Sequence, residues 1–473
     1  MPELSHENLT RENLTRENLT RKNPAVVPAT SSGDPRGAML LRVFDVLERA
    51  AVPWCALHGY QSWPADIGTD VDLLMGPRLL PGQLAKLLHE NRQYIGAEAV
   101  LWLNDGAQYI VLAAPAAAGQ RPCILQLHVS PDYSLAGRTF YKADEILASR
   151  VRKDKFWVPA PHHEFGCMLV NRVLKQSLRP EHERRLSELA AQHPANCERE
   201  ARRFFQPGDV RLILQAARTA DWSRIRHYSR DLRRGLLAGP GARPSGGNTA
   251  RWGRRLRRWA RPPCGLHLVF LGPDGVGKST VIQAVREQLS PIFLREKYLT
   301  FAPSLLPARF EVPKPDGPHS LPPRSYSASL IKAAWWTLCY TVGYLLSIRP
   351  TLARAGLVIN HRYLPDAIVD PKRYRYSGPH WPLRALWRVA PKPHLLFLLD
   401  APPEVILGRK QEVAMEEIVR QREAYRALAQ PLPFARIIDN SQPLEQVVAQ
   451  VGQMILDYLS SRSARQLKVG AGR

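Results

Sequence analysis

The segment GPDGVGKST, Gly272 to Thr280, has the residue types and spacing of a phosphate-binding loop. It satisfies G-x-x-x-x-G-K-[ST] and stands between an apolar strand-like run, HLVFL, and a helix-like segment, which is the context that the pattern requires. Backbone N–H groups of such a loop surround phosphate oxygens, while the lysine reaches the β- and γ-phosphates and the hydroxyl holds Mg²⁺. We therefore predict ATP and Mg²⁺ here, with ATP bound by Gly272, Gly275, Val276, Gly277, Lys278, Ser279 and Thr280, and Mg²⁺ by Ser279.

Asp274 lies inside this loop. A carboxylate beside the phosphates would repel them, so it is expected to serve a second substrate, most simply by accepting a hydrogen bond from its hydroxyl group. The loop thus predicts both a phosphoryl donor and a hydroxyl-bearing acceptor.

The acid in the loop makes this segment resemble the P-loop of thymidylate kinases, and the resemblance extends over most of Leu266 to Leu459. In GLVINHRYLPD, His361-Arg362-Tyr363 stands where thymidylate kinases carry Asp-Arg-Tyr or a close variant, which implies that Arg362 binds the acceptor phosphate. HLLFLLDAPPEV resembles the strand and turn that place Asp400 near Mg²⁺. GRKQEVAMEEIVRQR resembles the arginine-bearing lid over ATP, which implies catalytic roles for Lys278, Arg362, Arg409, Arg420 and Arg422.

Two departures from the thymidylate kinase pattern concern the acceptor. His361 replaces an acid, and a neutral imidazole cannot supply its charge. The loop DAIVDPKRYRYSG then resembles thymidylate kinase-like proteins of bacterial polysaccharide gene clusters, which implies a sugar-type acceptor as an alternative to a nucleotide. The predicted acceptor-binding residues are Asp274, Arg362, Tyr363, Asp366 and Arg373, with Asp370, Tyr374 and Arg375 in the same pocket.

The elements that must position these residues alternate regularly after Gly265. Five apolar strands with intervening helices predict an α/β fold, a P-loop NTPase of the nucleoside monophosphate kinase type whose parallel sheet carries helices on both faces. The apolar segment Leu330 to Ile348 is expected to be a buried core helix. A membrane span is the alternative, but Lys332 lies inside it.

A separate α+β unit is expected before this fold. LHGYQSWPADIGTDVDLLM places Asp70 and Asp72 after a strand and a turn, and so resembles the Asp-x-Asp strand of nucleotidyltransferases, in which two carboxylates hold two metal ions. Gln126 stands where a third acid is expected, and Tyr60 replaces a small turn residue. The resemblance therefore implies a nucleotidyltransferase-like domain whose catalytic site is degenerate; the alternative is an unrelated α+β domain with two solvated aspartates.

The predicted organisation is a disordered repeat tail (1–36), the nucleotidyltransferase-like domain (37–158), a helical appendage (159–237), a linker with an Arg-rich segment (238–262), the thymidylate kinase-like domain (263–463) and a basic tail (464–473). Six scattered cysteines without a CxxC pair indicate reduced thiols, no structural zinc and a cytoplasmic setting.

The chain of 473 residues has 66 Lys and Arg against 42 Asp and Glu, a formal net charge of +24. This excess favours anionic partners, although a generally basic composition explains it equally well. The expected partners are a small-molecule phosphate acceptor, an anionic membrane touched through the Arg-rich linker, and a second copy in a homodimer; nucleic acid is not expected.

The sequence thus predicts a phosphotransferase that moves the ATP γ-phosphoryl group to dTMP or a sugar-type acceptor. The alternative is an ATP-binding regulatory or scaffold protein of polysaccharide biosynthesis with an impaired kinase domain.

Overall fold

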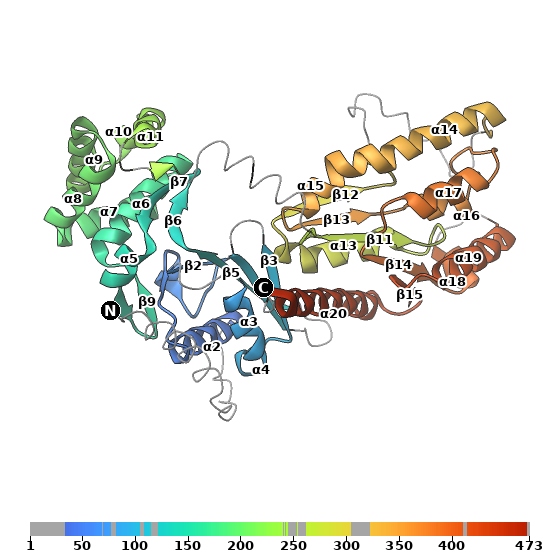
Figure 1. Cartoon of the computed structure of the whole chain (residues 1–473), viewed down its shortest axis with the longest axis horizontal. Helices are drawn as coiled ribbons and strands as arrows, with labels where there is room; N and C mark the ends of the chain where they lie inside the picture. Colours follow the sequence, from blue (N-terminus) through green and yellow to red (C-terminus); the bar gives the residue numbers. More distant parts are fainter. Residues whose placement is uncertain are drawn as a thin grey trace, which may run out of the picture.

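The computed structural model describes residues 34–68, 70–76, 82–104, 108–114, 122–239, 262–303, 322–409 and 414–470, together with residues 241, 243–244 and 253. They form two units, residues 34–244 and residues 262–470, each built around its own sheet (Figure 1). Most of the predicted N-terminal tail and of the Arg-rich segment lies outside the described residues.

The second unit has a five-stranded parallel sheet, as predicted. Its strands, in spatial order, are β12 (Arg295–Leu299), β13 (Gly356–Asn360), β11 (Leu266–Leu271), β14 (Leu395–Asp400) and β15 (Ala435–Asp439). Every residue of the three central strands is buried, because helices cover both faces of the sheet.

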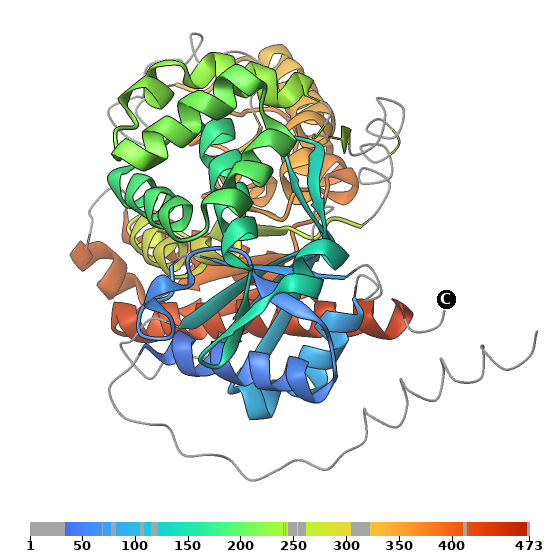
Figure 2. The same cartoon turned by 90° about the vertical axis from the view of Figure 1, so that its left-hand side faces the viewer.

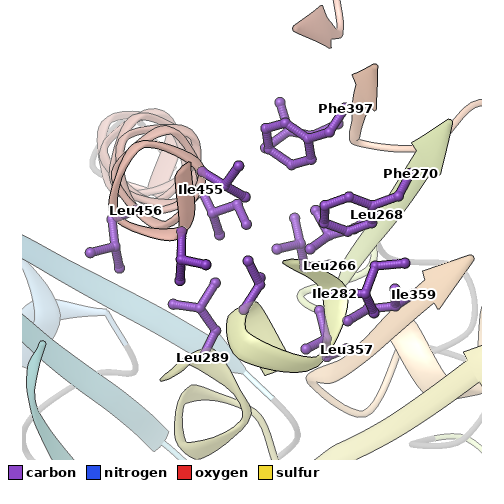
Figure 3. Packing of buried hydrophobic residues seen from close by; sticks show 14 of the residues in the cluster. Leu266, Leu268, Phe270, Ile282, Leu289, Leu357, Ile359, Phe397, Ile455 and Leu456 are labelled. Atoms are coloured by element: carbon purple, nitrogen blue, oxygen red, sulfur yellow. The ribbon is translucent and has the colours of Figure 1, made fainter. Parts of the chain in front are cut away.

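The helices around this sheet are α13 (Lys278–Leu289), η2 (Ser290–Ile292), α14 (Tyr326–Leu338), the π-helical segment η4 (Cys339–Ile348), α15 (Arg349–Leu352), α16 (Leu364–Val369), α17 (Trp381–Val389), α18 (Pro403–Arg409), α19 (Met415–Ala429) and α20 (Leu444–Gly470). Side chains of β11 alternate between two cores. Leu268 and Phe270 pack with α13 and α20 (Figure 3), whereas Val269 and Leu271 pack on the other face with residues of α14, α16, α17 and α19.

The apolar segment 330–348 is helical but only partly buried, so the prediction of a buried core helix is wrong for one of its faces. Ala333, Trp336 and Tyr340 enter the core, while Ile331 and Leu346 are exposed. Among the residues that the structure describes, no helix combines the length and the apolar character needed to cross a membrane.

The first unit contains a mixed sheet in the order β1 (Trp54–Ala56), β2 (Val71–Met75), β5 (Cys123–Ser130), β4 (Gln108–Ala114) and β3 (Ala99–Asn104). Strands β2 and β5 are parallel and the other neighbours are antiparallel. Helices and small strands complete it: α2 (Pro35–Arg49), η1 (Tyr60–Ser62), α3 (Gln83–Glu90), α4 (Arg92–Ile95), β6 (Asp132–Leu135), β7 (Arg138–Lys142), α5 (Ala143–Ser149), β8 (Val151–Lys153), β9 (Phe156–Val158) and β10 (Arg243–Pro244).

A helical layer follows in the chain. It comprises α6 (Pro161–Lys175), α7 (Pro180–Gln192), α8 (Pro194–Phe204), α9 (Pro207–Thr219), α10 (Ser223–His227) and α11 (Ser229–Ala238). The first four of these helices begin with proline, whose fixed φ suits the first helical position. Their apolar faces surround Phe165 and Trp222, away from the parallel sheet.

Helix α20 joins the two units. It packs on β3, and Leu456 and Leu459 share one hydrophobic core with Leu101 and Val111 of the first unit. Figure 2 shows this helix, in red, running behind the blue and teal strands of the N-terminal sheet. A basic tail was predicted from residue 464, but the structure continues the helix to Gly470, because Leu467 still packs into the core of the first unit.

Candidate active site

The phosphate-binding loop turns sharply between β11 and α13. Gly272, Gly275 and Gly277 have φ values of 142°, 82° and 96°, a region that only glycine adopts without strain. A Cβ at Gly277 would lie 2.8 Å from Asn440 Nδ2, and one at Gly272 would clash with the carbonyl oxygen of Leu399. Because these three residues have no side chain, the backbone of the loop can lie close beside the start of α13.

Lys278 spans this loop from the first turn of α13. Its buried Nζ donates to the carbonyl oxygens of Gly272 (2.7 Å) and Pro273 (2.8 Å) and lies 3.6 Å from Asp274 Oδ1. Two side chains from other segments also contact the loop, because Arg409 Nη1 (3.2 Å) and Asn440 Nδ2 donate hydrogen bonds to the carbonyl oxygen of Val276. Asn440 was not predicted, because nothing near it in the sequence marks it as part of the loop.

A phosphate chain fits this cradle. The first amides of α13 have no carbonyl of the preceding turn to bind, and the helix dipole makes this end positive. Ser279 and Thr280 are exposed there, and Lys278 supplies a full charge. Val276 is buried, so it can contribute only its backbone.

Asp274 brings two arginines to the acceptor side of the loop. Its Oδ1 accepts from Arg362 Nη2 and its Oδ2 pairs with Arg373 Nη1. Two predicted acceptor residues from distant parts of the chain thus meet at the predicted acid. In this structure, however, Asp274 is paired with guanidinium groups, so it does not stand free to accept a substrate hydroxyl.

Asp366 and Tyr363 are both predicted to bind the acceptor, and in the structure both side chains are buried and bonded to other protein groups. Asp366 is buried, accepts hydrogen bonds from Tyr374 Oη (2.6 Å) and Tyr425 Oη, and forms an ion pair with Arg362 Nε at 3.2 Å. It therefore positions Arg362. Tyr363, directly before α16, is fully buried in the core beside Tyr340 and Trp387, and its hydroxyl donates to the carbonyl oxygen of Pro391 (2.7 Å).

Asp400 does not have the surroundings expected of a metal ligand. Its Oδ1 accepts from Arg422 Nε (2.7 Å) and its Oδ2 from Arg426 Nε (2.8 Å). Two guanidinium groups already use the charge of this carboxylate. Arg426, which was not predicted, follows Arg422 by four residues and so lies on the same face of α19.

The predicted lid arginines therefore contact three different parts of the protein. Arg409 touches the P-loop, Arg422 touches Asp400, and Arg420 lies elsewhere. Arg420 pairs with Glu417 and donates to the carbonyl oxygen of Val369 (3.0 Å), which ties α19 to the end of α16.

His361 lies at the end of β13, with Nε2 3.5 Å from Ser279 Oγ. Burial lowers its pKa to about 4, and Lys278 and Arg362 add to the effect. The imidazole is therefore neutral at neutral pH. Of the two predicted metal ligands, the Ser279 hydroxyl is exposed beside the loop, whereas Asp400 is paired with Arg422 and Arg426 in this structure.

The first unit places Asp72 beside two histidines. The parallel register sets Asp72 opposite His128, and His128 Nδ1 lies 2.8 Å from Asp72 Oδ1, with His58 Nδ1 3.4 Å from Oδ2. The residue of β5 that lies beside Asp72 is thus His128 rather than Gln126, which lies two residues earlier on the same strand. Within the described residues, the group of three side chains with metal-like spacing is His162, His163 and Glu200, which does not include Asp70 or Asp72.

Comparisons with known proteins concern the P-loop part of the chain. No family model matches the sequence. The thymidylate kinase of Symbiobacterium thermophilum is 27% identical over 218 residues, covering 42% of this chain and 95% of that protein. The thymidylate kinase of Leuconostoc citreum is 23% identical over 220 residues, covering 42% and 97%. That of Xanthomonas campestris (strain B100) is 33% identical over 136 residues, covering 26% and 55%.

Among solved structures, a crystal structure of thymidylate kinase from Ehrlichia chaffeensis matches 41% of this chain and 100% of its own, at 18% identity and a TM-score of 0.30. About 40% of the chain is homologous to thymidylate kinases and has a thymidylate kinase-like P-loop fold.

Proposed function

We propose that this protein is an ATP- and Mg²⁺-dependent phosphotransferase that transfers the ATP γ-phosphoryl group to a nucleoside monophosphate such as dTMP or to a sugar-type acceptor. The observation that carries the proposal is the meeting of Lys278, Asp274, Arg362 and Arg373 at one loop. The phosphoryl donor and the phosphoryl acceptor would lie on opposite sides of this loop.

The roles follow from the contacts. Lys278 and the amides at the start of α13 bind the donor phosphates, and the Ser279 hydroxyl is the group suited to Mg²⁺, which would neutralise phosphate charge when bound. Arg362 and Arg373 bind and orient the acceptor, because guanidinium groups form paired hydrogen bonds with anionic oxygens.

Two carboxylates hold four arginines at the site. Asp274 pairs with Arg362 and Arg373, and Asp400 pairs with Arg422 and Arg426. We propose that these pairs keep the guanidinium groups in place until phosphate oxygens take over their hydrogen bonds. Arginines set in advance stabilise charge on the transferring group without moving far.

The test is a transfer assay with γ-labelled ATP and three acceptor classes: dTMP, free sugars and lipid-linked sugars. Lys278→Ala should lower kcat by about 10²-fold or more, as expected when a preorganised charge is removed from the transferring group. Arg373→Ala should raise the KM of the acceptor and leave that of ATP unchanged. Lys86→Ala, an exposed lysine of the first unit, is the control.

Transfer by Lys278→Ala at the wild-type rate would contradict the proposal. The acceptor class that gives a phosphorylated product decides whether the natural acceptor is a nucleoside monophosphate or a sugar.

His361 favours a second function, an ATP-binding regulatory or scaffold protein of polysaccharide biosynthesis whose kinase site is impaired. A neutral imidazole stands where thymidylate kinases carry an acid. Tight ATP binding with no phosphorylated product from any acceptor class would support it, and product formation at ordinary kinase rates would exclude it.

A further inference from the structure

One segment of the second unit contains many more basic than acidic residues. Residues 322–399 contain two acidic residues, Asp366 and Asp370, and both are buried. The same stretch contains eleven basic residues: Arg324, Lys332, Arg349, Arg354, Arg362, Lys372, Arg373, Arg375, Arg384, Arg388 and Lys392. Its surface therefore presents positive charge and no carboxylate.

The exposed face of α14 and η4, which we call the uncharged face, lies in this stretch. It consists of Ile331, Ala334, Trp335, Thr337, Leu338, Thr341, Leu345 and Leu346. Ile331 is 71% exposed and Leu346 is 70% exposed, although both are large apolar residues. Lys332 does not interrupt the face, because its Nζ turns inward to the carbonyl oxygen of Tyr374.

The π-helical segment keeps this face continuous. The exposed positions Leu338, Thr341 and Leu345 follow one another by three and four residues across the start of this segment. A π-helix has more residues per turn than an α-helix, and the buried positions Cys339, Gly343 and Ile348 follow one another by four and five residues. Arg324 precedes the uncharged face and Arg349 follows it.

Helix α17 packs beside α14 through a shared core (Figure 1). Trp381 and Val389 at its two ends are 68% and 71% exposed. Arg384 and Arg388 are exposed between them and follow Trp381 by three and seven residues, on one face of the helix. Exposed aromatic and aliphatic side chains thus alternate with arginines here too.

We propose that the uncharged face and the neighbouring arginines dock this protein onto the surface of an anionic lipid bilayer. Large apolar side chains enter the boundary between head groups and acyl chains, and basic side chains around them bind acidic head groups. A second copy of the chain fits less well, because a symmetric contact would bring the same arginines together. Nucleic acid would use the charge but leave Ile331 and Leu346 without a role.

The test is co-sedimentation of the full chain with vesicles. We expect binding to vesicles of 30% phosphatidylglycerol in phosphatidylcholine, and binding at least about tenfold weaker to pure phosphatidylcholine, because each basic residue near the surface adds to the attraction. The double variant Ile331→Ser/Leu346→Ser should lose about tenfold or more of the affinity for the anionic vesicles, through lost apolar burial. Ile437→Ser, at an isoleucine that is 46% exposed on β15, should bind like the wild type.

Three outcomes would overturn the proposal. The first is equal binding to both kinds of vesicle. The second is a double variant, folded by circular dichroism, that binds like the wild type while replacement of the arginines between residues 251 and 261 abolishes binding. The third is a stable dimer, seen by light scattering without vesicles, that the double variant converts to a monomer.

Discussion

At the scale of single residues, the candidate site is organised by carboxylates that hold arginines. Asp274 and Asp400 come from different strand ends, and each accepts from two guanidinium groups. Guanidinium hydrogen bonds to anionic oxygens are strong and directional. The arginines are therefore placed by short local contacts, and a phosphate could replace the carboxylate as their partner.

His361 makes a prediction about pH and stability. Its pKa is about 4 in the folded chain, below the ordinary value of 6.5, mainly because burial disfavours the charged imidazole. Between these two values the unfolded chain binds a proton that the folded chain does not, so the free energy of unfolding should fall as the pH drops from about 6.5 to 4. Above pH 7 both states are neutral and the contribution vanishes.

Replacement of His361 by Asn should therefore weaken this dependence, measured as the difference in urea-unfolding free energy between pH 7.5 and pH 5. His227→Asn changes an exposed histidine and is the control. An unchanged difference in the His361 variant would contradict the prediction. His267, buried with a pKa of about 4, should keep part of the dependence in both variants.

At the scale of elements, Asp366 joins three segments. It lies on α16 and accepts from Tyr425 of α19 and from Tyr374 of the loop between α16 and α17. Burial is the main reason that the pKa of both tyrosines is raised well above its ordinary value, so both hydroxyls remain donors. The carboxylate thus holds the helix bearing Arg422 and Arg426 against the helix that follows Arg362.

Removal of this carboxylate should cost more than removal of one hydroxyl. Asp366→Ala leaves two buried hydroxyls without their partner and removes one of the two carboxylates that pair with Arg362, so we expect a loss of about 3 kcal/mol in unfolding free energy. Tyr425→Phe should cost about 1 kcal/mol. Tyr228→Phe, at an exposed tyrosine, is the control in the same denaturant titration. Equal costs for Asp366→Ala and Tyr425→Phe would show that Asp366 does not join these elements.

At the scale of the whole molecule, the two units share one hydrophobic core. Leu101 of β3, Val111 of β4, Leu289 of α13 and Leu459 of α20 all belong to it. The backbone N–H of Trp102 also donates to Ser463 Oγ (3.3 Å). Because α20 belongs to the P-loop unit and lies against the N-terminal sheet, separation of the units would expose apolar surface on both.

We therefore expect the two units to unfold together. ATP that binds only the P-loop should raise the midpoint of one common transition, by a stabilisation of about 2.7 kcal/mol at one hundred times its dissociation constant. Differential scanning calorimetry with and without ATP measures this, and Lys278→Ala should lose the shift. Two transitions, of which ATP moves only one, would contradict the shared core.

Much of the P-loop unit could be predicted from local sequence. Apolar runs such as LHLVFL mark buried strands because helices on both faces leave no polar side, and GPDGVGKST marks the turn between β11 and α13 because its glycines adopt positive φ. The burial of Tyr363 and Asp366 could not be predicted from the sequence, for a physical reason. Residue type shows that a side chain can bind a ligand, but only packing shows whether it points to the site or to the core.

The sequence by itself determined the order of the strands and helices of the P-loop unit and the position of the phosphate loop, since these depend on residues that lie close together in the chain. The tertiary structure alone decided that Asp274 meets Arg362 and Arg373, that Asp400 meets Arg426 instead of standing free for a metal, and that His128 rather than Gln126 lies beside Asp72. It also decided that α20 reaches the first unit and that Ile331 faces outward. These facts depend on strand register and helix rotation, which arise from packing between segments far apart in the sequence.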